Sequence, residues 1–166
     1  RSLFGCGPNA VQLGFDFSSL EARIQGHYCL NYTNGEALTK MLLAEKPNDW
    51  HSVVAKALGM SRTDVKSFNY AILYGAQIAK IMKMLSCSRD RATELYNGFW
   101  ESNPALKELR DKVELYWEAT NRKYVLGIDG RKIFIRSKHS ILNALFQSAG
   151  VISTKYVTIM IYQMLE

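Results

Sequence analysis

Paired helix start and stop signals divide the middle of this 166-residue chain into short helices. Asp49 stands directly before the segment 50–58 and Gly59 directly after it, as an N-cap and a helix stop do. The segment 61–75 repeats the arrangement, with a Ser-x-x-Asp capping box at its start, a helix expected to reach Tyr74, and a terminal glycine. With the helical segments that follow, these signals predict a mostly helical fold.

The same signals continue toward the end of the chain. Two shorter helices are expected after residue 75, and a longer one begins near Pro104. Residues 124–136 alternate around Asp129-Gly130, which is typical of a β-hairpin turn. A final helix follows Ser140 and lacks a C-cap, so we expect the chain to end inside this element.

Residues 10–17 alternate between apolar and other side chains with the period of a β-strand. The pattern places Asp16 on the face opposite the core. Ser18 and Glu21 then have the spacing of a capping box, which predicts a helix from Ser19. With the hairpin, this strand makes the expected fold class α+β, mostly helical, with part of an antiparallel sheet.

Composition limits the classes of function. The net charge is +6, and the whole excess lies in residues 55–138, which hold 16 basic and 9 acidic residues. Such a surplus favours a polyanionic partner. Three widely spaced cysteines suit neither a disulfide framework nor a structural zinc site, and indicate a reducing compartment. Polar residues interrupt the apolar stretch 149–165, so we expect no membrane-spanning segment.

Four polar or aromatic side chains recur every four residues in the second of the central helices: Arg62, Lys66, Tyr70 and Tyr74. They form one slowly winding stripe along a helix. Two cations suit a triphosphate and two rings suit a sugar and a base. The alternative is a solvated amphipathic face with buried tyrosines. Likewise Asp16, at the end of the expected strand, is either a ligand for Mg²⁺ or a cap or turn former.

Together these two features resemble a known family. The sequence D-F-S-S-L-E-A-R at 16–23 is similar to motif A of family A DNA polymerases, D-x-S-x-x-E-x-R. Residues 62–75 resemble motif B, R-x-x-x-K-x-x-x-(Tyr or Phe)-x-x-x-Y-G. Four further segments resemble the family in the same order: R-S-L-F at 1–4, D-W-H at 49–51, D-G-R at 129–131 and L-N-A-L-F-Q-S-A-G at 142–150.

The resemblance implies a fragment of a DNA-directed DNA polymerase acting in the cytoplasm of a bacterium or a phage-infected host. Residues 1–30 would be a palm segment, 31–123 the fingers, and 124–166 a hairpin and helix returning to the palm. The family's third motif, H-D-E, is missing because none of the three histidines precedes an aspartate. We therefore expect the chain to lack the second catalytic aspartate, to be inactive alone, and to need the thumb and the rest of the palm.

The resemblance to motif A implies residues that bind the metal ions and residues that contact the sugar of the nucleotide. Asp16 would bridge two Mg²⁺ ions, with the carbonyl of Phe17 as a further ligand. Glu21 would exclude a ribose 2′-hydroxyl, in competition with its place in the capping box. The substrates would be deoxynucleoside triphosphates and primer-template DNA.

Motif B implies contacts with the nucleotide. Arg62 and Lys66 would hold the triphosphate, and Lys66 would also act as a general acid toward pyrophosphate. Tyr70 would face the incoming sugar. His51 would be a further phosphate contact, although the alternative is a partly exposed histidine at a helix start.

The remaining candidates would touch DNA. Tyr74 would stack at the templating position, although a buried tyrosine before a glycine stop is the alternative. Arg136, Asn143 and Gln147 would lie along primer-template DNA, where amide donors can test base pairing from the minor groove. The alternative for the last two is a set of polar spots on a packing helix.

Two other functions stay open at this stage. A noncatalytic nucleic-acid-binding module would use the basic segment alone and would need neither Asp16 nor Glu21. A phage-type single-subunit RNA polymerase would share the aspartate and the cation-aromatic helix, but would not be expected to carry this glutamate.

Overall fold

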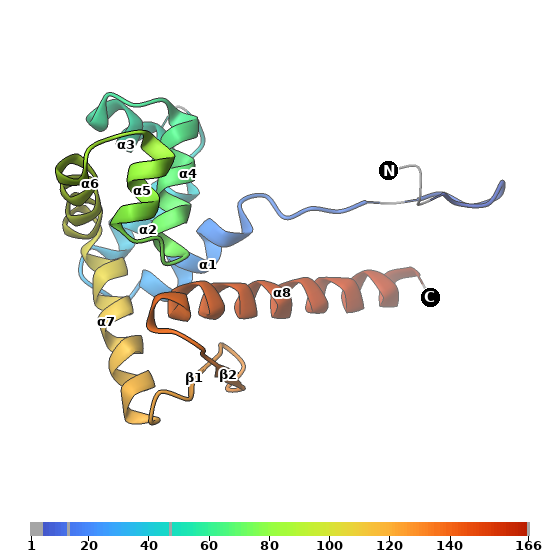
Figure 1. The fold of residues 1–166 in the computed structure, drawn as a ribbon. Coiled ribbons are helices and arrows are strands. Elements are labelled where there is room, and N and C mark those ends of the chain that lie inside the picture. The colour runs from blue at the N-terminus through green and yellow to red at the C-terminus, as the bar shows by residue number, and fades with distance from the viewer. Residues whose placement is uncertain (1–4, 13, 47, 166) are drawn as a thin grey trace.

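The structure is a computed structural model that describes residues 5–12, 14–46 and 48–165. Helices dominate it, and one β-hairpin precedes the last helix (Figure 1). The order of elements is α1 (Leu20–Cys29), α2 (Gly35–Leu43), α3 (Trp50–Leu58), α4 (Arg62–Leu73), α5 (Ile78–Leu85), α6 (Arg89–Ser102), α7 (Pro104–Ala119), β1 (Tyr124–Leu126), β2 (Lys132–Phe134), a short 3₁₀ turn η1 (Lys138–Ser140) and α8 (Ile141–Leu165). The expected α+β, mostly helical class is confirmed.

The main apolar core lies between the helices, and each of α1 to α7 and the first half of α8 contributes buried side chains to it. Phe68 of α4 and Phe146 of α8 are among its largest fully buried side chains. A smaller cluster joins Trp117 of α7 to Val125 of the hairpin. Burial of these faces, rather than intrinsic propensity, stabilises helices of this length.

The expected boundaries of α3 are confirmed, and α4 begins as expected but ends one residue earlier. Asp49 is the N-cap residue of α3, and Gly59 ends that helix with φ of 63°. The Ser61 hydroxyl accepts a hydrogen bond of 3.1 Å from the Asp64 backbone N–H at the start of α4. The last helical residue of α4 is Leu73, so Tyr74 is its C-cap. These local signals set where α3 and α4 begin and end.

The prediction of a strand over residues 10–17 is wrong. The described residues of this segment have no regular structure, and Val11 and Phe15 are 85% and 69% exposed. A strand needs a neighbour that accepts its backbone hydrogen bonds, and in the part of the chain that the structure describes the only sheet is the β1–β2 hairpin. Leu13, one of the alternating residues, and the R-S-L-F segment at 1–4 lie outside the described residues.

The capping box at the start of α1 is also wrong. The N-cap is Ser19, in the left-handed region at φ of 54°, and it makes no side-chain cap hydrogen bond. The helix begins at Leu20, one residue later than expected. The Glu21 carboxylate instead accepts hydrogen bonds from Tyr74, at the end of α4, and from Gln147 of α8. These partners are distant in the sequence, so a local pattern could not predict them.

Two further helices depart from expectation. Helix α2 was not predicted, because no capping motif precedes it in the sequence. Its N-cap residue, Asn34, has a left-handed backbone conformation. Its Leu38 and Leu42 are buried at helical spacing, a pattern that could have revealed it. The second of the two short helices expected after residue 75, α6, has 14 residues and buries Phe99 and Trp100.

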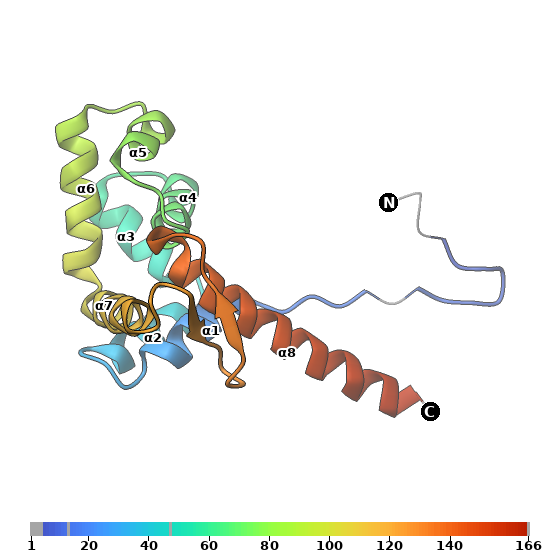
Figure 2. The same ribbon diagram turned by 60° about the horizontal axis from the view of Figure 1, so that its bottom comes forward.

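The hairpin and the last helix follow the prediction. β1 and β2 pair antiparallel, with Tyr124 opposite Phe134, and Gly130 turns the chain at φ of 77°. The first half of α8 is buried against α1 and α7, whereas its second half projects from the helical cluster (Figures 1 and 2).

Helix α8 with the preceding turn is long and apolar enough to cross a membrane, although polar interruptions led us to expect no such segment. Residues 138–165 reach a mean hydropathy of 1.2 over 18 residues. Core helices and signal sequences meet the same criterion, so it does not by itself identify a membrane span.

Candidate functional site

A cavity of about 520 Å³ lies between the start of α1, the end of α2, and helices α3 and α4. Four residues that the sequence singled out line it together: His51, Arg62, Lys66 and Tyr70. Four basic side chains and two acidic ones face the cavity, so its surroundings are cationic. The remaining lining residues are Ser18, Ser19, Ala22, Arg23, Leu42, Leu43, Ala44, Glu45, Lys46, Asp49 and Trp50.

The stripe along α4 divides between two neighbourhoods. Arg62, Lys66 and Tyr70 line the cavity, and the Lys66 Nζ lies 6.0 Å from the centre of the Tyr70 ring. Tyr74 does not line it, although its ring centre is 5.9 Å from that of Tyr70. Burial, with the nearby Glu21 carboxylate, raises the pKa of Tyr70, so its hydroxyl keeps its proton at neutral pH.

Arg62 is held by a buried carboxylate. Its Nη2 lies 2.9 Å from Asp49 Oδ1, and its Nε lies 3.3 Å from Asp49 Oδ2. The Ser52 hydroxyl donates to the same carboxylate at 2.7 Å. Burial opposes ionisation of Asp49, but the hydrogen bonds from Arg62 and Ser52 outweigh it and lower its pKa to about 2. Asp49 therefore fixes the guanidinium at the cavity wall.

His51 lies half-buried between aromatic rings. Its ring centre is 5.3 Å from that of Trp50 and 5.6 Å from that of Tyr70. Its Nδ1 lies 3.2 Å from the Nδ2 of Asn69 on α4. Burial and the charge of Arg62 lower the pKa of His51, Asp49 opposes them, and Lys66 adds to the lowering, so the imidazole is neutral at pH 7.

Three side chains from distant parts of the chain meet beside the cavity. Glu21 of α1 accepts hydrogen bonds from the Tyr74 hydroxyl and, at 2.7 Å, from the Gln147 amide of α8. Burial and the Glu21 carboxylate raise the pKa of Tyr74, so its hydroxyl stays protonated. With 39% of its surface exposed, Tyr74 is not the buried tyrosine of the alternative interpretation. The trio ties α1, α4 and α8 together at one point.

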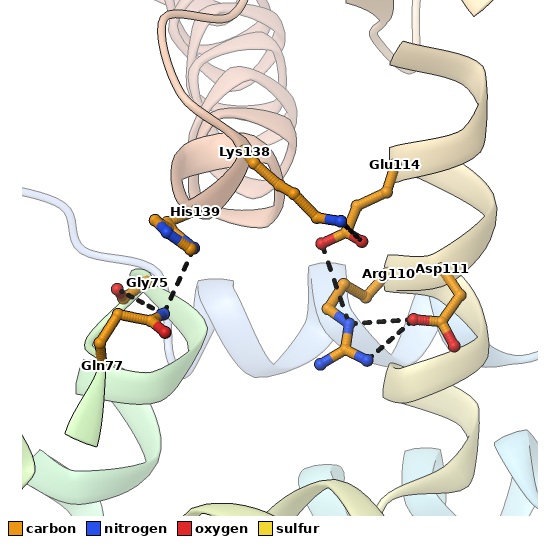
Figure 3. Close-up of polar contacts among 7 residues, drawn as sticks. All are labelled: Gly75, Gln77, Arg110, Asp111, Glu114, Lys138 and His139. Atoms are coloured by element: carbon orange, nitrogen blue, oxygen red, sulfur yellow. Dashed lines mark hydrogen bonds and ion pairs between the residues drawn. The ribbon is translucent and has the colours of Figure 1, made fainter. Parts of the chain in front are cut away.

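The end of α4 also rests on the turn that leads into α8 (Figure 3). Gly75 has φ of 86°, and a Cβ at this position would lie 2.2 Å from the carbonyl oxygen of His139. The Gln77 amide lies 3.3 Å from both the Gly75 carbonyl oxygen and the His139 Nδ1. Only glycine allows this close approach of two backbones.

The other side of this joint is ionic. Lys138 Nζ lies 3.0 Å from Glu114 Oε2 on α7, and Arg110 Nε lies 4.0 Å from the other oxygen of Glu114 (Figure 3). Arg110 also pairs with Asp111 at 2.8 Å. The turn before α8 is therefore attached both to the end of the cavity helix and to α7.

Asp16 and Phe17 lie just before the cavity. Asp16 is exposed, Phe17 is half-buried, and Ser18 is already a lining residue. A carboxylate and a backbone carbonyl are the hard oxygen ligands that Mg²⁺ prefers. Over the described ranges, however, no three His, Cys, Asp or Glu side chains come together as a metal cluster. The described chain thus places two oxygen donors of the kind that Mg²⁺ prefers just before the cavity.

The remaining predicted residues lie farther along the chain. Arg136 is exposed after β2, and Asn143 is half-buried one turn before Gln147 on α8. Gln147 is brought to Glu21 and Tyr74. No hydrogen bond or ion pair among the described residues joins Arg136 or Asn143 to the cavity residues.

Two polar residues of the site were missed as site residues. Asp49 was expected only as a helix cap, and Asn69 was not singled out at all. Asp49 lies 13 positions before Arg62 and Asn69 lies 18 positions after His51, so these pairs form only when α3 packs on α4. The local signal for both was weak, because Asn69 is an uncharged polar residue within motif B and Asp49 already had an explanation as a helix cap.

Comparison with known proteins assigns the family. The model of DNA polymerase family A matches residues 1–157. The chain is 34% identical over 168 residues to the DNA-directed DNA polymerases of Enterobacteria phage T3 and Escherichia phage T7, covering 93% of this chain and 23% of each relative. It is 26% identical over 188 residues to DNA polymerase I of Caldicellulosiruptor bescii, covering all of this chain and 21% of the relative.

The chain thus spans about a quarter of the length of the phage polymerases it matches. The family match covers motif A, the α3–α4 cavity and the turn into α8, which are the parts where the candidate residues gather. This chain belongs to DNA polymerase family A.

Proposed function

We propose that this chain is the nucleotide-binding part of a DNA-directed DNA polymerase. The observation that carries the proposal is the cationic cavity that gathers His51, Arg62, Lys66 and Tyr70 in one place. Residues 31–123 would form the fingers, and the segments on either side, 1–30 and 124–166, would belong to the palm.

The cavity suits the triphosphate of a deoxynucleotide. Arg62 is pre-oriented by Asp49, and Lys66 is an exposed ammonium one turn further along α4. Charge-assisted contacts to phosphate are stronger than neutral hydrogen bonds. Lys66 would also donate a proton to the leaving pyrophosphate, since it would lie beside that oxygen.

Metal binding would need more than this chain. Asp16 and the Phe17 carbonyl would contribute ligands for Mg²⁺, which when bound stabilises the charge that develops during phosphoryl transfer. The remaining carboxylate ligands would come from the rest of the palm. We therefore propose that the 166 residues alone do not extend a primer.

Sugar selection would fall to Glu21 and Tyr70. Glu21 is held in place by Tyr74 and Gln147, so its carboxylate would form a fixed wall beside the sugar rather than a mobile side chain. Tyr70 keeps its hydroxyl protonated and would offer it to the sugar.

Primer-template DNA would lie along the other end of α4 and along α8. Tyr74 and Gln147 are exposed there, and Arg136 and Asn143 would extend the same surface. The thumb and the rest of the palm would be the protein partners of this part, in the cytoplasm of a bacterium or a phage-infected host.

The test is sugar discrimination by the full-length polymerase that contains this sequence. Single-turnover incorporation of ribo-, deoxy- and dideoxynucleotides would be measured for the wild type, Glu21→Ala and Tyr70→Phe. Glu21→Ala should raise the ribo-to-deoxy ratio because the wall is removed. Tyr70→Phe should lower dideoxynucleotide use because the hydroxyl no longer replaces the missing 3′-hydroxyl contact, an effect of roughly 1 to 3 kcal/mol.

The matched control is Glu36→Ala, which removes a glutamate from the first turn of α2 on an exposed surface. It should leave all three rates unchanged. Unchanged sugar ratios in both site variants would contradict the sugar-pocket assignment. Preferential use of ribonucleotides by the wild type would favour an RNA polymerase, and DNA binding without any nucleotide incorporation would favour a noncatalytic module.

A further inference from the structure

Asn69 is a polar residue in an apolar part of the core. It lies on α4 beside Phe68, and its side chain is fully buried. Burial of an amide is unfavourable unless it is hydrogen-bonded. Its single side-chain partner among the described residues is His51, with 3.2 Å between Asn69 Nδ2 and His51 Nδ1, while its Oδ1 has no partner there. An apolar side chain of similar size would fill this position without the cost of burying an amide, so the contact with His51 is the feature that needs an explanation.

This contact decides which nitrogen of His51 carries the hydrogen. A neutral imidazole has one N–H and one unprotonated nitrogen, and the partner of one nitrogen sets the state of the other. When the Asn69 amide N–H donates to Nδ1, that nitrogen must be unprotonated. The hydrogen is then on Nε2, the ring nitrogen that Asn69 does not contact, and His51 is a lining residue of the cavity.

The charged and titratable groups around His51 favour a neutral ring in that state. Arg62 and Lys66 of α4 disfavour an imidazolium and Asp49 favours it, while the neutral Tyr70 ring lies 5.6 Å away. The opposite orientation of the Asn69 amide would place Oδ1 on Nδ1–H. That orientation would favour the Nδ1–H tautomer and would leave both amide N–H groups buried without a partner.

We propose that Asn69 is a positioning residue that holds His51 as the neutral Nε2–H tautomer. The cavity then has a hydrogen-bond donor that needs no protonation near neutral pH. Its use toward a phosphate oxygen rests on the proposed function, whereas the tautomer itself does not. Asn69 acts through His51 and does not line the cationic cavity.

The test is the tautomeric state of His51, measured by long-range ¹H–¹⁵N correlation spectroscopy of the ¹⁵N-labelled chain. The chain has three histidines, so His27 and His139 are internal references and His51→Gln identifies the signals of His51. At pH 7 we expect Nε2 protonated and Nδ1 unprotonated in the wild type. An Nδ1–H tautomer, or a fast average of the two forms, would overturn the proposal.

Two substitutions test the cause. Asn69→Asp replaces the donor by an acceptor, so the hydrogen should move to Nδ1 and His51 should titrate at higher pH. Asn69→Leu removes the partner at similar volume, so the two tautomers should interconvert and average. Asn97→Asp, the same change on the exposed face of α6, is the control and should leave His51 unchanged. If the buried carboxylate of Asn69→Asp prevents folding, the Asn69→Leu variant is the test. An unaltered Nε2–H signal of His51 in Asn69→Leu would refute the role of Asn69.

A binding arm separates this proposal from the proposed function. Affinity for inorganic triphosphate would be measured from mildly acidic to mildly basic pH for the wild type, in which His51 is neutral, and for Asn69→Asp and His51→Gln. A dependence on His51 titration should appear in Asn69→Asp and be absent in the wild type. Equal affinities for wild type and His51→Gln would reject the phosphate contact of His51, but would leave the tautomer result standing.

Discussion

The two parts of the candidate site differ in how their residues are held. In the α3–α4 part, Arg62 pairs with Asp49, His51 contacts Asn69, and the Tyr70 ring lies tilted beside that of His51. The segment that carries Asp16 is exposed and has no regular structure. The residues proposed to bind the nucleotide are thus fixed by contacts within the chain, whereas the described segment proposed to bind metal has no regular structure to hold it.

This difference separates function from stability in a testable way. A residue held by neighbours contributes to both, because removing it also removes packing or hydrogen bonds. An exposed residue such as Asp16 can be removed at little cost in stability. Substitutions of residues held by neighbours should therefore change both stability and activity, whereas substitutions of exposed residues such as Asp16 should change activity alone.

The largest effect is expected for Asp16→Ala in the full-length polymerase. Loss of a carboxylate metal ligand removes several kcal/mol of charge stabilisation, so primer extension should fall by about 1,000-fold or more. The thermal midpoint should stay unchanged, because Asp16 is exposed. Single-turnover extension and a melting curve of the same sample measure both, with Asp90→Ala on the exposed start of α6 as control. A loss of stability equal to the loss of activity would show that this segment is packed in the whole enzyme.

The next effect is structural and lies at the joint between α4 and α8. Gly75→Ala should lower the free energy of unfolding by about 3 kcal/mol, because the new methyl meets the His139 carbonyl oxygen and the left-handed backbone disfavours a side chain. Gly59→Ala separates the two causes. Gly59 has φ of 63°, but no atom lies within 4 Å of the position that a methyl group would take there, so only the backbone cost of about 1 kcal/mol remains. Equal losses in urea denaturation of the two variants would show that the joint yields without strain.

A smaller effect is expected for Lys66→Ala in the full-length polymerase. Removal of one charge-assisted contact costs about 1.5 to 3 kcal/mol, so affinity for the deoxynucleotide should fall about 10- to 150-fold. Primer-template affinity and stability should change little, because Lys66 is exposed. Lys80→Ala, an exposed lysine on α5, is the control in titrations of both ligands. A loss of DNA affinity with unchanged nucleotide affinity would make the α4 stripe a duplex-binding face.

The sequence predicted most where local chemistry decides the structure. The caps around α3 and α4 are set within a few residues, and the stripe of Arg62, Lys66 and Tyr70 follows from helical spacing, so both were recognisable. The prediction of a strand at 10–17 failed, because an alternating pattern favours a strand only where a partner strand is available to pair with it. Glu21 shows the same limit, since its partners lie 53 and 126 residues away. Contacts of that range depend on the packing of whole helices.

The smallest effect concerns pH and the Asp49–Arg62 pair. The pKa of Asp49 is about 2 in the folded chain, below its ordinary value of 3.8, because the hydrogen bonds from Arg62 and Ser52 outweigh burial. A lowered pKa in the folded state stabilises the fold above the pKa of the unfolded chain, and this contribution is lost as pH falls from about 4 through about 2. Asp49→Asn should therefore lower the free energy of unfolding at pH 7 by about 1 kcal/mol, a modest value because Arg62 is partly exposed. The difference from wild type should shrink as the pH approaches 2. Urea denaturation at several pH values measures it, with Asp90→Asn as the control of equal charge change. A difference that stays constant down to the lowest pH would mean that Asp49 acts through its shape as a helix cap, and that Arg62 is positioned by α4 alone.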